Sequence, residues 1–533
     1  MRMKTEKHVS RTARTVARSI RGVVLLLLSH GIATAYASDL DTVGITLLRA
    51  TTTNLNGAGI PVAQAEAQIA TSPPTWEVNP GAGGIGLTAA KFTYYSTNGS
   101  ATTFPNALGS ESGHADSVAG LLYGTGGGVS TNVSHIDNYL ADDFVLTVLP
   151  TLSAINDRVV NQSFNLNATG TQQTAFDKTW DNYAALYNTV FVTGIGNGGP
   201  VNAPSTCYNG IGVGAYGGAS STGPTPDNGR AKPDITAPGG ATSYSTPLVS
   251  GAAVILLQAA VRGDGGSATN VAADARTIKA LLLNGAVKPA DWANPGMSPF
   301  DPRYGAGVLN VFNSYKQLTG GKHPYVASSS VSAGGPHPAT VGSGNVSSLY
   351  GWDFNTNTSS SVPASDGVNH YYFNLTNNSL FTGTATLVWN RQLNATGINQ
   401  LDLYLYNATS GSLVAVSSNS VDNVKHVSVS HLPPGRYDLQ VLKSSGNSVS
   451  SSETYALAFE FFTMPLSLTP SGNNVVITWP DYPAGFVLES TATPTSSGSW
   501  SAVGATPTVT NNQNSVTIST SSGQQFFRLN RLH

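Results

Sequence analysis

The chain has 533 residues, more than one hydrophobic core usually holds, so two to four domains are expected. Only 10% of its residues are charged and 57 are glycine, a composition that favours exported proteins rich in β structure and turns. Cys207 is the only cysteine, which excludes an intrachain disulfide. Without the export segment described next, 19 basic and 27 acidic residues remain, and this net charge of −8 argues against nucleic acid or anionic membrane as a partner.

Residues 1–37 have the pattern of a signal peptide. Seven Lys and Arg residues precede an apolar stretch from Gly22 to Ala33, and an Ala-Tyr-Ala cleavage site follows at 35–37. The apolar stretch is too short to span a hydrocarbon core of ~30 Å, which disfavours the alternative of a membrane anchor. We expect a secreted mature chain, whether extracellular, periplasmic or at the cell surface, that is monomeric and not inserted in a membrane.

Residues 38–320 alternate short apolar strands with helical segments, which predicts an α/β domain with a mainly parallel sheet flanked by helices. The expected strands are 60–65, 159–164, 189–194 and 210–216. The expected helices are 114–123, 175–187, the segment after Ser243, and 275–284. Sites in open α/β sheets form at the carboxyl ends of the strands, so functional residues are expected there.

The C-terminal part of the chain has a different character. A Ser/Gly/Asn-rich linker with first strands is expected over 321–366, a β-sandwich domain over 367–463 and a small β domain over 464–533. The expected sandwich strands are 371–375, 383–389, 400–406, 413–417, 424–429, 437–442 and 454–462. Those of the last domain are 474–479, 485–490, 515–518 and 525–529.

Ser243 is the candidate nucleophile. It lies in Ala241-Thr242-Ser243-Tyr244-Ser245-Thr246-Pro247, a small-residue turn that leads into the apolar run 252–260. A serine in the first turn of a buried helix lies beside unpaired backbone N–H groups and the positive end of the helix dipole, so negative charge that develops there is stabilised.

A serine nucleophile needs a histidine to take its proton and a carboxylate to orient the histidine. His114, set among small residues at a predicted helix start, is the candidate base, although a structural role is the common one for a lone histidine. His135 is its competitor and lacks that setting. Glu66, at the end of the strand 60–65, is the candidate acid, and a solvated carboxylate at the strand end is the alternative interpretation.

Asn197 is the candidate oxyanion donor. It lies in Gly194-Ile195-Gly196-Asn197-Gly198-Gly199 after an expected strand, where its amide could donate to a developing oxyanion. The alternative is an ordinary turn asparagine with positive φ.

In the order acid, His, Asn, Ser, these residues resemble the subtilisin-like serine peptidases (S8 type). Residues 241–247 are similar to that family's Gly-Thr-Ser-Met-Ala-Xaa-Pro box, which implies Ser243 rather than Ser245 as nucleophile. Gly113-His114 with Val118-Ala119-Gly120 is similar to its histidine box, and Ile195-Gly196-Asn197 to its oxyanion turn. The resemblance implies a subtilisin-like fold over about 43–318.

Further stretches between these boxes carry the same resemblance. Residues 159–164 are similar to the strand that pairs with extended substrate, which implies substrate binding around Ser163, Phe164, Asn165, Gly194 and Gly196. Residues 232–239 are similar to the lead into the serine box, and 279–284 and 305–310 look like the family's last helices.

The chain departs from the family at the acid and around the nucleophile. Glu66 replaces the usual aspartate, which moves the carboxylate by ~1.5 Å unless the strand recedes, and Asp116 is the alternative acid but should point elsewhere. Ala241 replaces a glycine, and Tyr244 replaces a methionine. Ala37 and Val43 leave no room between them for the propeptide that many relatives carry.

The preferred interpretation is a secreted serine endopeptidase that acts on protein or peptide substrates through a Glu66-His114-Ser243 triad, with Asn197 as oxyanion donor. It requires no cofactor, and the resemblance leaves structural calcium open, although no acidic loop identifies a metal site. The alternative is a catalytically silent scaffold whose β domains bind a surface or glycan. A sedolisin-like site is disfavoured by His114 and Asn197, and an esterase by the lack of a Gly-Xaa-Ser-Xaa-Gly elbow.

Overall fold

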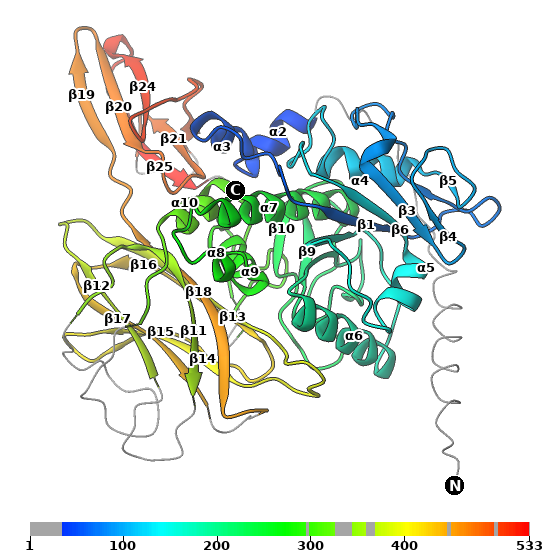
Figure 1. Ribbon diagram of the computed structural model, residues 1–533. Coiled ribbons are helices and arrows are strands. Elements are labelled where there is room, and N and C mark those ends of the chain that lie inside the picture. Colours follow the sequence, from blue (N-terminus) through cyan, green and yellow to red (C-terminus); the bar gives the residue numbers. More distant parts are fainter. Residues whose placement is uncertain are drawn as a thin grey trace.

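A computed structural model describes residues 35–294, 298–325, 344–358, 368–444, 449–494 and 499–531 (Figure 1). Most of the predicted signal peptide, residues 1–34, lies outside the described residues, as does much of the predicted linker. The predicted cleavage site at 35–37 forms the start of helix α2 (Ala35–Thr42). The α/β domain is at the right of Figure 1, the β-sandwich at the lower left and the small β module at the upper left.

The α/β domain is built on one twisted sheet. Its strands run in the order β10 (Ile235–Pro238), β9 (Ile211–Tyr216), β8 (Val190–Gly194), β7 (Val159–Gln162), β1 (Val62–Glu66), β6 (Ile136–Leu140), β3 (Phe92–Ser96) and β4 (Gly99–Ala101). All neighbouring pairs are parallel except β3 with β4. The carboxyl ends of β1, β7 and β8 therefore meet at one edge, which brings Glu66 to the same edge as the segments that follow Gln162 and Gly194.

Helices cover both faces of this sheet. Besides α2, the described α-helices are α3 (Ile45–Thr51), α4 (Gly113–Leu122), α5 (Ala141–Asp143), α6 (Thr171–Tyr187), α7 (Thr242–Arg262), α8 (Thr269–Ala272), α9 (Ala275–Asn284) and α10 (Val311–Thr319). One core contains apolar residues of α4, α7 and α9 against one face, and a second core packs Trp180 and Tyr183 of α6 against the other. Two short strands, β2 (Thr75–Glu77) and β5 (Ser110–Glu111), pair in parallel beside α4.

Helix α7 passes through the centre of the domain. Among the described residues it is the one helix long and apolar enough to cross a membrane, but most of its apolar stretch is buried by the surrounding strands and helices. Its composition is therefore that of a core helix, and the small residues Gly251 and Ala252 allow close packing against Val129 and α4.

The predicted fold class is confirmed, and the predicted strands and helices of the α/β domain agree with the structure to within a few residues. One prediction was wrong: residues 305–310 do not form a helix. Gly305 and Gly307 have φ values of +61° and +137°, and Val308 bridges to Thr236 and Val287. The helix α10 begins only at Val311, with the Asn310 side chain as its N-cap.

The next domain is an antiparallel β-sandwich. In the described residues one sheet has the order β11 (Tyr350–Thr358), β18 (Ser452–Phe462), β13 (Phe381–Trp389) and β16 (Val424–Leu432), and the other has β12 (Val368–Leu375), β17 (Gly435–Lys443), β14 (Leu401–Asn407) and β15 (Leu413–Ser417). Alternate residues of both sheets fill a common core, as the period-two pattern predicts.

The C-terminal module is smaller and also antiparallel. Its described strands form two sheets. One has the order β19 (Ser467–Ser471), β20 (Asn474–Pro480), β24 (Gln513–Ser519) and β23 (Thr508–Thr510), and the other has the order β22 (Ser501–Ala502), β21 (Phe486–Thr491) and β25 (Phe526–Arg531). The module is tied to helix α10, because the Asn313 side chain donates to the Ala484 carbonyl and accepts from the Ala484 N–H.

The β-sandwich shares a core with the α/β domain. Val388, Val424, Ala456 and Ala458 of the sandwich lie in the same apolar cluster as α7 and α9. Polar contacts add to this interface: the Gln317 amide donates to Glu460, and Thr386 donates to Asn284. The two domains therefore form a continuous structure, not a pair joined only by a linker.

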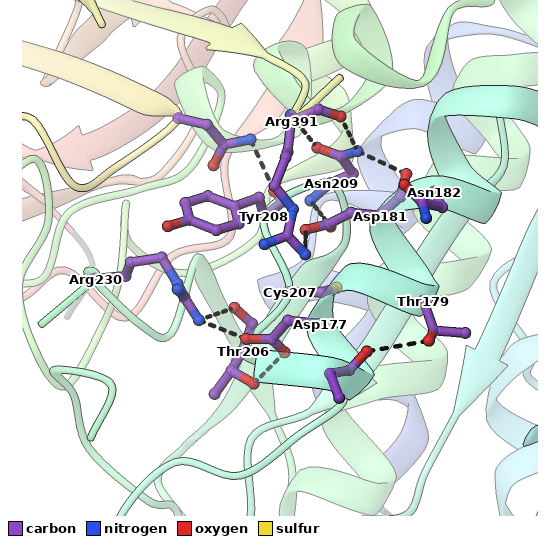
Figure 2. Close-up of polar contacts among 12 residues, drawn as sticks. Asp177, Thr179, Asp181, Asn182, Thr206, Cys207, Tyr208, Asn209, Arg230 and Arg391 are labelled. Atoms are coloured by element: carbon purple, nitrogen blue, oxygen red, sulfur yellow. Dashed lines mark hydrogen bonds and ion pairs between the residues drawn. The ribbon is translucent and has the colours of Figure 1, made fainter. Parts of the chain in front are cut away.

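A buried group of charges lies at one end of this interface, shown in Figure 2. Arg230 pairs with Asp177 at 2.6 Å, and Arg391, from the loop after β13, pairs with Asp181 of α6 at 2.7 Å. The Tyr208 ring lies between the two guanidinium groups, 4.3 Å and 4.9 Å from their carbons. Burial is the largest influence on the pKa of Cys207, beside this group, and raises it to about 12.

Candidate active site

The structure joins Glu66 and His114 directly. Glu66 is the last residue of β1, and His114 lies in the first turn of α4, which begins after the N-cap Ser112. Glu66 Oε2 and His114 Nδ1 are 2.8 Å apart, and both side chains are buried. Glu66 therefore has the position needed to fix the tautomer of His114 and to stabilise its cation.

The second carboxylate oxygen of Glu66 is held as well. Gln64 donates from Nε2 to Glu66 Oε1 at 2.8 Å and to the Ala115 carbonyl at 3.0 Å. The Tyr123 hydroxyl in turn donates to Gln64 Oε1 at 2.7 Å. Sequence reasoning missed Gln64 and Tyr123, although a polar residue within the apolar strand 60–65, on the same face as Glu66, was the visible sign.

Asp116 is directed away from His114, as predicted. Its Oδ1 accepts from the Asn79 N–H at 2.8 Å. Burial is the main influence on the pKa of Asp116 and raises it to about 7, and the neighbouring carboxylates of Glu111 and Glu66 act in the same direction. His135, the competing histidine, pairs with Asp137 at 3.2 Å and is half-exposed beside β6, away from this edge of the sheet.

Ser243 lies at the start of α7, as the sequence predicts. Its hydroxyl makes a long hydrogen bond of 3.5 Å to the Ser163 carbonyl, and its own carbonyl accepts from Ser163 Oγ at 3.0 Å. Within the described part of the chain, the buried His114 Nε2 has no hydrogen-bond partner. The Glu–His half of the proposed triad is thus formed, whereas the Ser–His hydrogen bond is not. Such bonds often form only once substrate is bound.

Asn197 is fastened to the same helix terminus. Its Oδ1 accepts from the Thr242 N–H at 2.8 Å and from the Thr242 hydroxyl at 2.9 Å. Because the N-cap Ala241 has no side-chain acceptor, Asn197 satisfies one of the unpaired N–H groups of α7. This leaves the Asn197 amide N–H groups for another acceptor. The turn interpretation fails for Asn197 itself, since the positive φ values belong to Gly196, Gly198 and Gly199.

The segment 163–165 adjoins Ser243, and its backbone is free at Phe164 and Asn165. In the described residues, no hydrogen bond involves the backbone N–H or carbonyl of Phe164 or Asn165. An extended peptide could therefore pair with this edge. The Phe164 side chain packs into the core under α6, so only its backbone is available to a ligand, and the Asn165 Oδ1 is buried without a partner among these residues.

Two glycines of the predicted substrate site allow close approach. A Cβ at Gly194 would lie 3.0 Å from Thr242 Oγ1 and 3.1 Å from Thr246 Oγ1, so a side chain here would push β8 away from α7. Gly196 has a φ of +108°, and a Cβ there would lie 2.7 Å from Ser221 Oγ. Ser221 also accepts from the Gly198 N–H, so it supports the turn that presents Asn197.

The electrostatics of His114 result from two opposing effects. Burial is the largest and lowers the pKa of His114, but the charge of Glu66 and its hydrogen bond together outweigh burial and leave the pKa raised above 6.5. The Tyr244 ring lies 6.3 Å from the His114 ring, and burial, assisted by Glu66, raises the pKa of its phenol. In the residues that the structure describes, no group of three His, Cys, Asp or Glu side chains is placed to hold a metal ion.

The sequence model of the subtilase family, Peptidase S8, matches residues 86–352. The chain belongs to the subtilase family. The match includes His114, Asn197 and Ser243 but begins after Glu66, so the position of Glu66 rests on the geometry above. A search of curated proteins finds no match.

Solved structures of proteases are similar to about half of this chain. The prenylagaramide maturation protease PagA is 20% identical, with a TM-score of 0.37, and covers 52% of this chain and 99% of its own. A protease from Pseudoalteromonas arctica is 16% identical, with a TM-score of 0.34, and the match covers 49% of this chain and 91% of that protease. Sphericase is 19% identical, with a TM-score of 0.34, and the match covers 50% of this chain and 97% of sphericase.

Proposed function

We propose that this subtilase is a serine endopeptidase that uses Glu66, His114 and Ser243 as its triad. The observation that carries the proposal is the buried hydrogen bond of 2.8 Å between Glu66 and His114, at the sheet edge where α7 presents Ser243. A glutamate at this position occupies the role of the usual aspartate because it is the last residue of β1 and its carboxylate reaches Nδ1.

The reaction follows from these positions. Ser243 Oγ attacks the scissile carbonyl carbon while His114 Nε2 takes the hydroxyl proton. The C–N bond then breaks, and the departing amine takes that proton from His114, which leaves an acyl group on Ser243. A water molecule, deprotonated by His114, attacks the acyl carbon and releases the carboxylic acid and the serine hydroxyl.

The charge that develops during each attack requires donors. The N–H groups at the start of α7 and the Asn197 amide are the proposed oxyanion donors, since Asn197 Oδ1 is anchored on Thr242 and its amide N–H groups are not. The segment 163–165, with its free backbone at Phe164 and Asn165, is the proposed binding site for an extended peptide. We further propose export of the chain through residues 1–37, calcium binding in surface loops and glycan contact by the β domains.

A catalytically silent scaffold is the second candidate. The observation in its favour is that the Ser243 hydroxyl is bonded to the Ser163 carbonyl and not to His114. Activity requires that hydroxyl to rotate toward His114 when substrate binds, whereas a scaffold has no such requirement.

The experiment is hydrolysis of a denatured protein by the purified mature chain, with the new termini identified by mass spectrometry. We expect cleavage by the wild type and its loss in Ser243→Ala and His114→Ala. Glu66→Gln should reduce kcat by orders of magnitude, because the amide cannot stabilise the imidazolium. Asp116→Asn is the matched control on the same helix and should retain activity. Equal cleavage by Ser243→Ala and wild type would refute the proposal.

A further inference from the structure

We propose that Gln64 is a positioning residue that holds Glu66 toward His114, with Tyr123 as its anchor. This inference rests on the proposed function, because positioning matters only if Glu66 orients the catalytic histidine. It explains how a glutamate can serve where relatives use the shorter aspartate.

Gln64 and Glu66 are two residues apart in β1, so their side chains leave the same face of the strand. Both are almost fully buried, at 0% and 1% exposure. Each oxygen of the Glu66 carboxylate has its own donor, Gln64 Nε2 for Oε1 and His114 Nδ1 for Oε2. A carboxylate bonded on both sides cannot rotate without breaking one of the two bonds.

Hydrogen bonds join the Gln64 side chain to both ends of helix α4. Its Nε2 also donates to the Ala115 carbonyl in the first turn of α4, next to His114, and its Oε1 accepts from Tyr123, the C-cap of the same helix. The amide therefore fixes Glu66 relative to the helix that carries His114. All of its polar atoms are bonded, so its orientation is also determined.

The longer side chain makes such a support necessary. Glutamate has one more rotatable bond than aspartate, and a catalytic group must be held within about 0.5 Å of its working position. The hydrogen bond from Gln64 to Glu66 Oε1 restricts rotation about that additional bond. An apolar residue at position 64 would leave Glu66 Oε1 buried and without this donor, which would favour rotation away from His114.

The test replaces Gln64 by methionine, which keeps the shape of the side chain but removes its hydrogen bonds. Tyr123→Phe removes only the anchor, and the double variant avoids an unpaired tyrosine hydroxyl. Gln317→Met and Tyr183→Phe are matched controls: Gln317 is a buried glutamine that donates to Glu460, and the buried Tyr183 donates to the Ser153 carbonyl, both away from the site.

Two readouts separate positioning from a merely structural role. The first is the division of any loss between kcat and KM. The second is NMR titration of His114 in a Ser243→Ala background, which needs no activity, together with the downfield proton of the Nδ1–H bonded to Glu66. The other titratable groups around Glu66 are Asp116 and Tyr123 of α4 and Tyr244 of α7, and only Tyr123 is changed in the series.

For Gln64→Met we expect kcat to fall about 10-fold or more with KM within about twofold of wild type, since the binding edge is untouched. The pKa of His114 should fall by about half a unit or more, because the raising effect of Glu66 weakens while burial remains. The Nδ1–H proton should weaken or broaden. Tyr123→Phe should give smaller changes of the same sign, and the two controls should lose stability without these changes.

Two results would overturn the proposal. One is a pKa and Nδ1–H proton of His114 that are unchanged or raised in Gln64→Met. The other is a loss of kcat no larger than that of Gln317→Met. If Gln64→Met does not fold, Tyr123→Phe decides by the same readouts. An inactive wild type whose His114 still responds to Gln64→Met would refute the proposed function and leave the positioning role standing.

Discussion

Replacement of Arg391 tests how strongly the β-sandwich is joined to the α/β domain. The Arg391 guanidinium lies 2.7 Å from Asp181, and the two side chains are 4% and 1% exposed. The Arg391 backbone is also held by Asn209, which accepts from its N–H at 2.7 Å and donates to its carbonyl at 2.9 Å. Arg391→Met preserves these backbone bonds and removes the charge together with the guanidinium contact to the Tyr208 ring.

The expected loss is large because a carboxylate remains buried without its partner. Breaking one side of a buried ion pair costs about 3–5 kcal/mol, which is a substantial part of the ~5–15 kcal/mol that stabilises a typical domain. Asp181→Asn in the same chain should recover about half of this loss, since a neutral amide needs no counter-charge. The Asn209 N–H bond to Asp181 Oδ1 can still form with an amide oxygen.

The pH dependence of this loss has a definite sign. Burial is the largest influence on the pKa of Asp181 and raises it, against the opposing attraction of Arg391. A raised carboxyl pKa means that the folded state binds more protons, so stability falls as pH rises through it. Without Arg391 the pKa rises further, so the loss should be larger at pH 8 than at pH 5, because a higher pKa favours the protonated carboxyl at the lower pH.

The assay is urea unfolding of wild type, both single variants and the double variant at pH 5 and pH 8, followed by tryptophan fluorescence. Equal slopes with denaturant would show that the same surface unfolds in each variant. A loss below about 1 kcal/mol at pH 8, or a double variant no more stable than Arg391→Met, would refute the reasoning.

Four further outcomes are expected. The ratio kcat/KM should rise with pH to a half-maximum above pH 6.5, because His114 must be neutral to act as a base and its pKa is raised. A profile with an acid optimum would contradict this. Asn197→Ala should lower kcat about 10²- to 10³-fold, a magnitude taken from the equivalent substitution in subtilisin. Mild peroxide should leave activity intact because Tyr244 replaces an oxidisable methionine, as residual activity after treatment would show. A chain truncated after Gly320 should fail to unfold cooperatively in calorimetry, since apolar residues of α9 and α10 lose their cover.

The sequence was sufficient to predict the fold class and to name candidate site residues, because each has a local sign. Strand and helix periodicity located most elements of the α/β domain, and the small residues before α7 marked Ser243. The helix predicted at 305–310 failed because long-range bridges to β10 and Val287 determine the conformation of that segment.

The contacts that complete the site could not be predicted in the same way. The bond of Gln64 to Tyr123 joins residues 59 positions apart, and that of Asn197 to Thr242 joins residues 45 apart. Nor could sequence distinguish a solvated Glu66 from a buried one, because that depends on α4 covering the end of β1. Arg391 gave no sign at all of its partner in α6, since only the docking of the two domains brings them together.

The most direct test of the triad is labelling of the purified chain by a fluorophosphonate probe, with the modified residue located by mass spectrometry. Our account predicts phosphonylation at Ser243, abolished in Ser243→Ala and His114→Ala and strongly slowed in Glu66→Gln. Absence of labelling in the folded wild type would contradict the account, and labelling that is as fast in Glu66→Gln as in wild type would remove Glu66 from the triad.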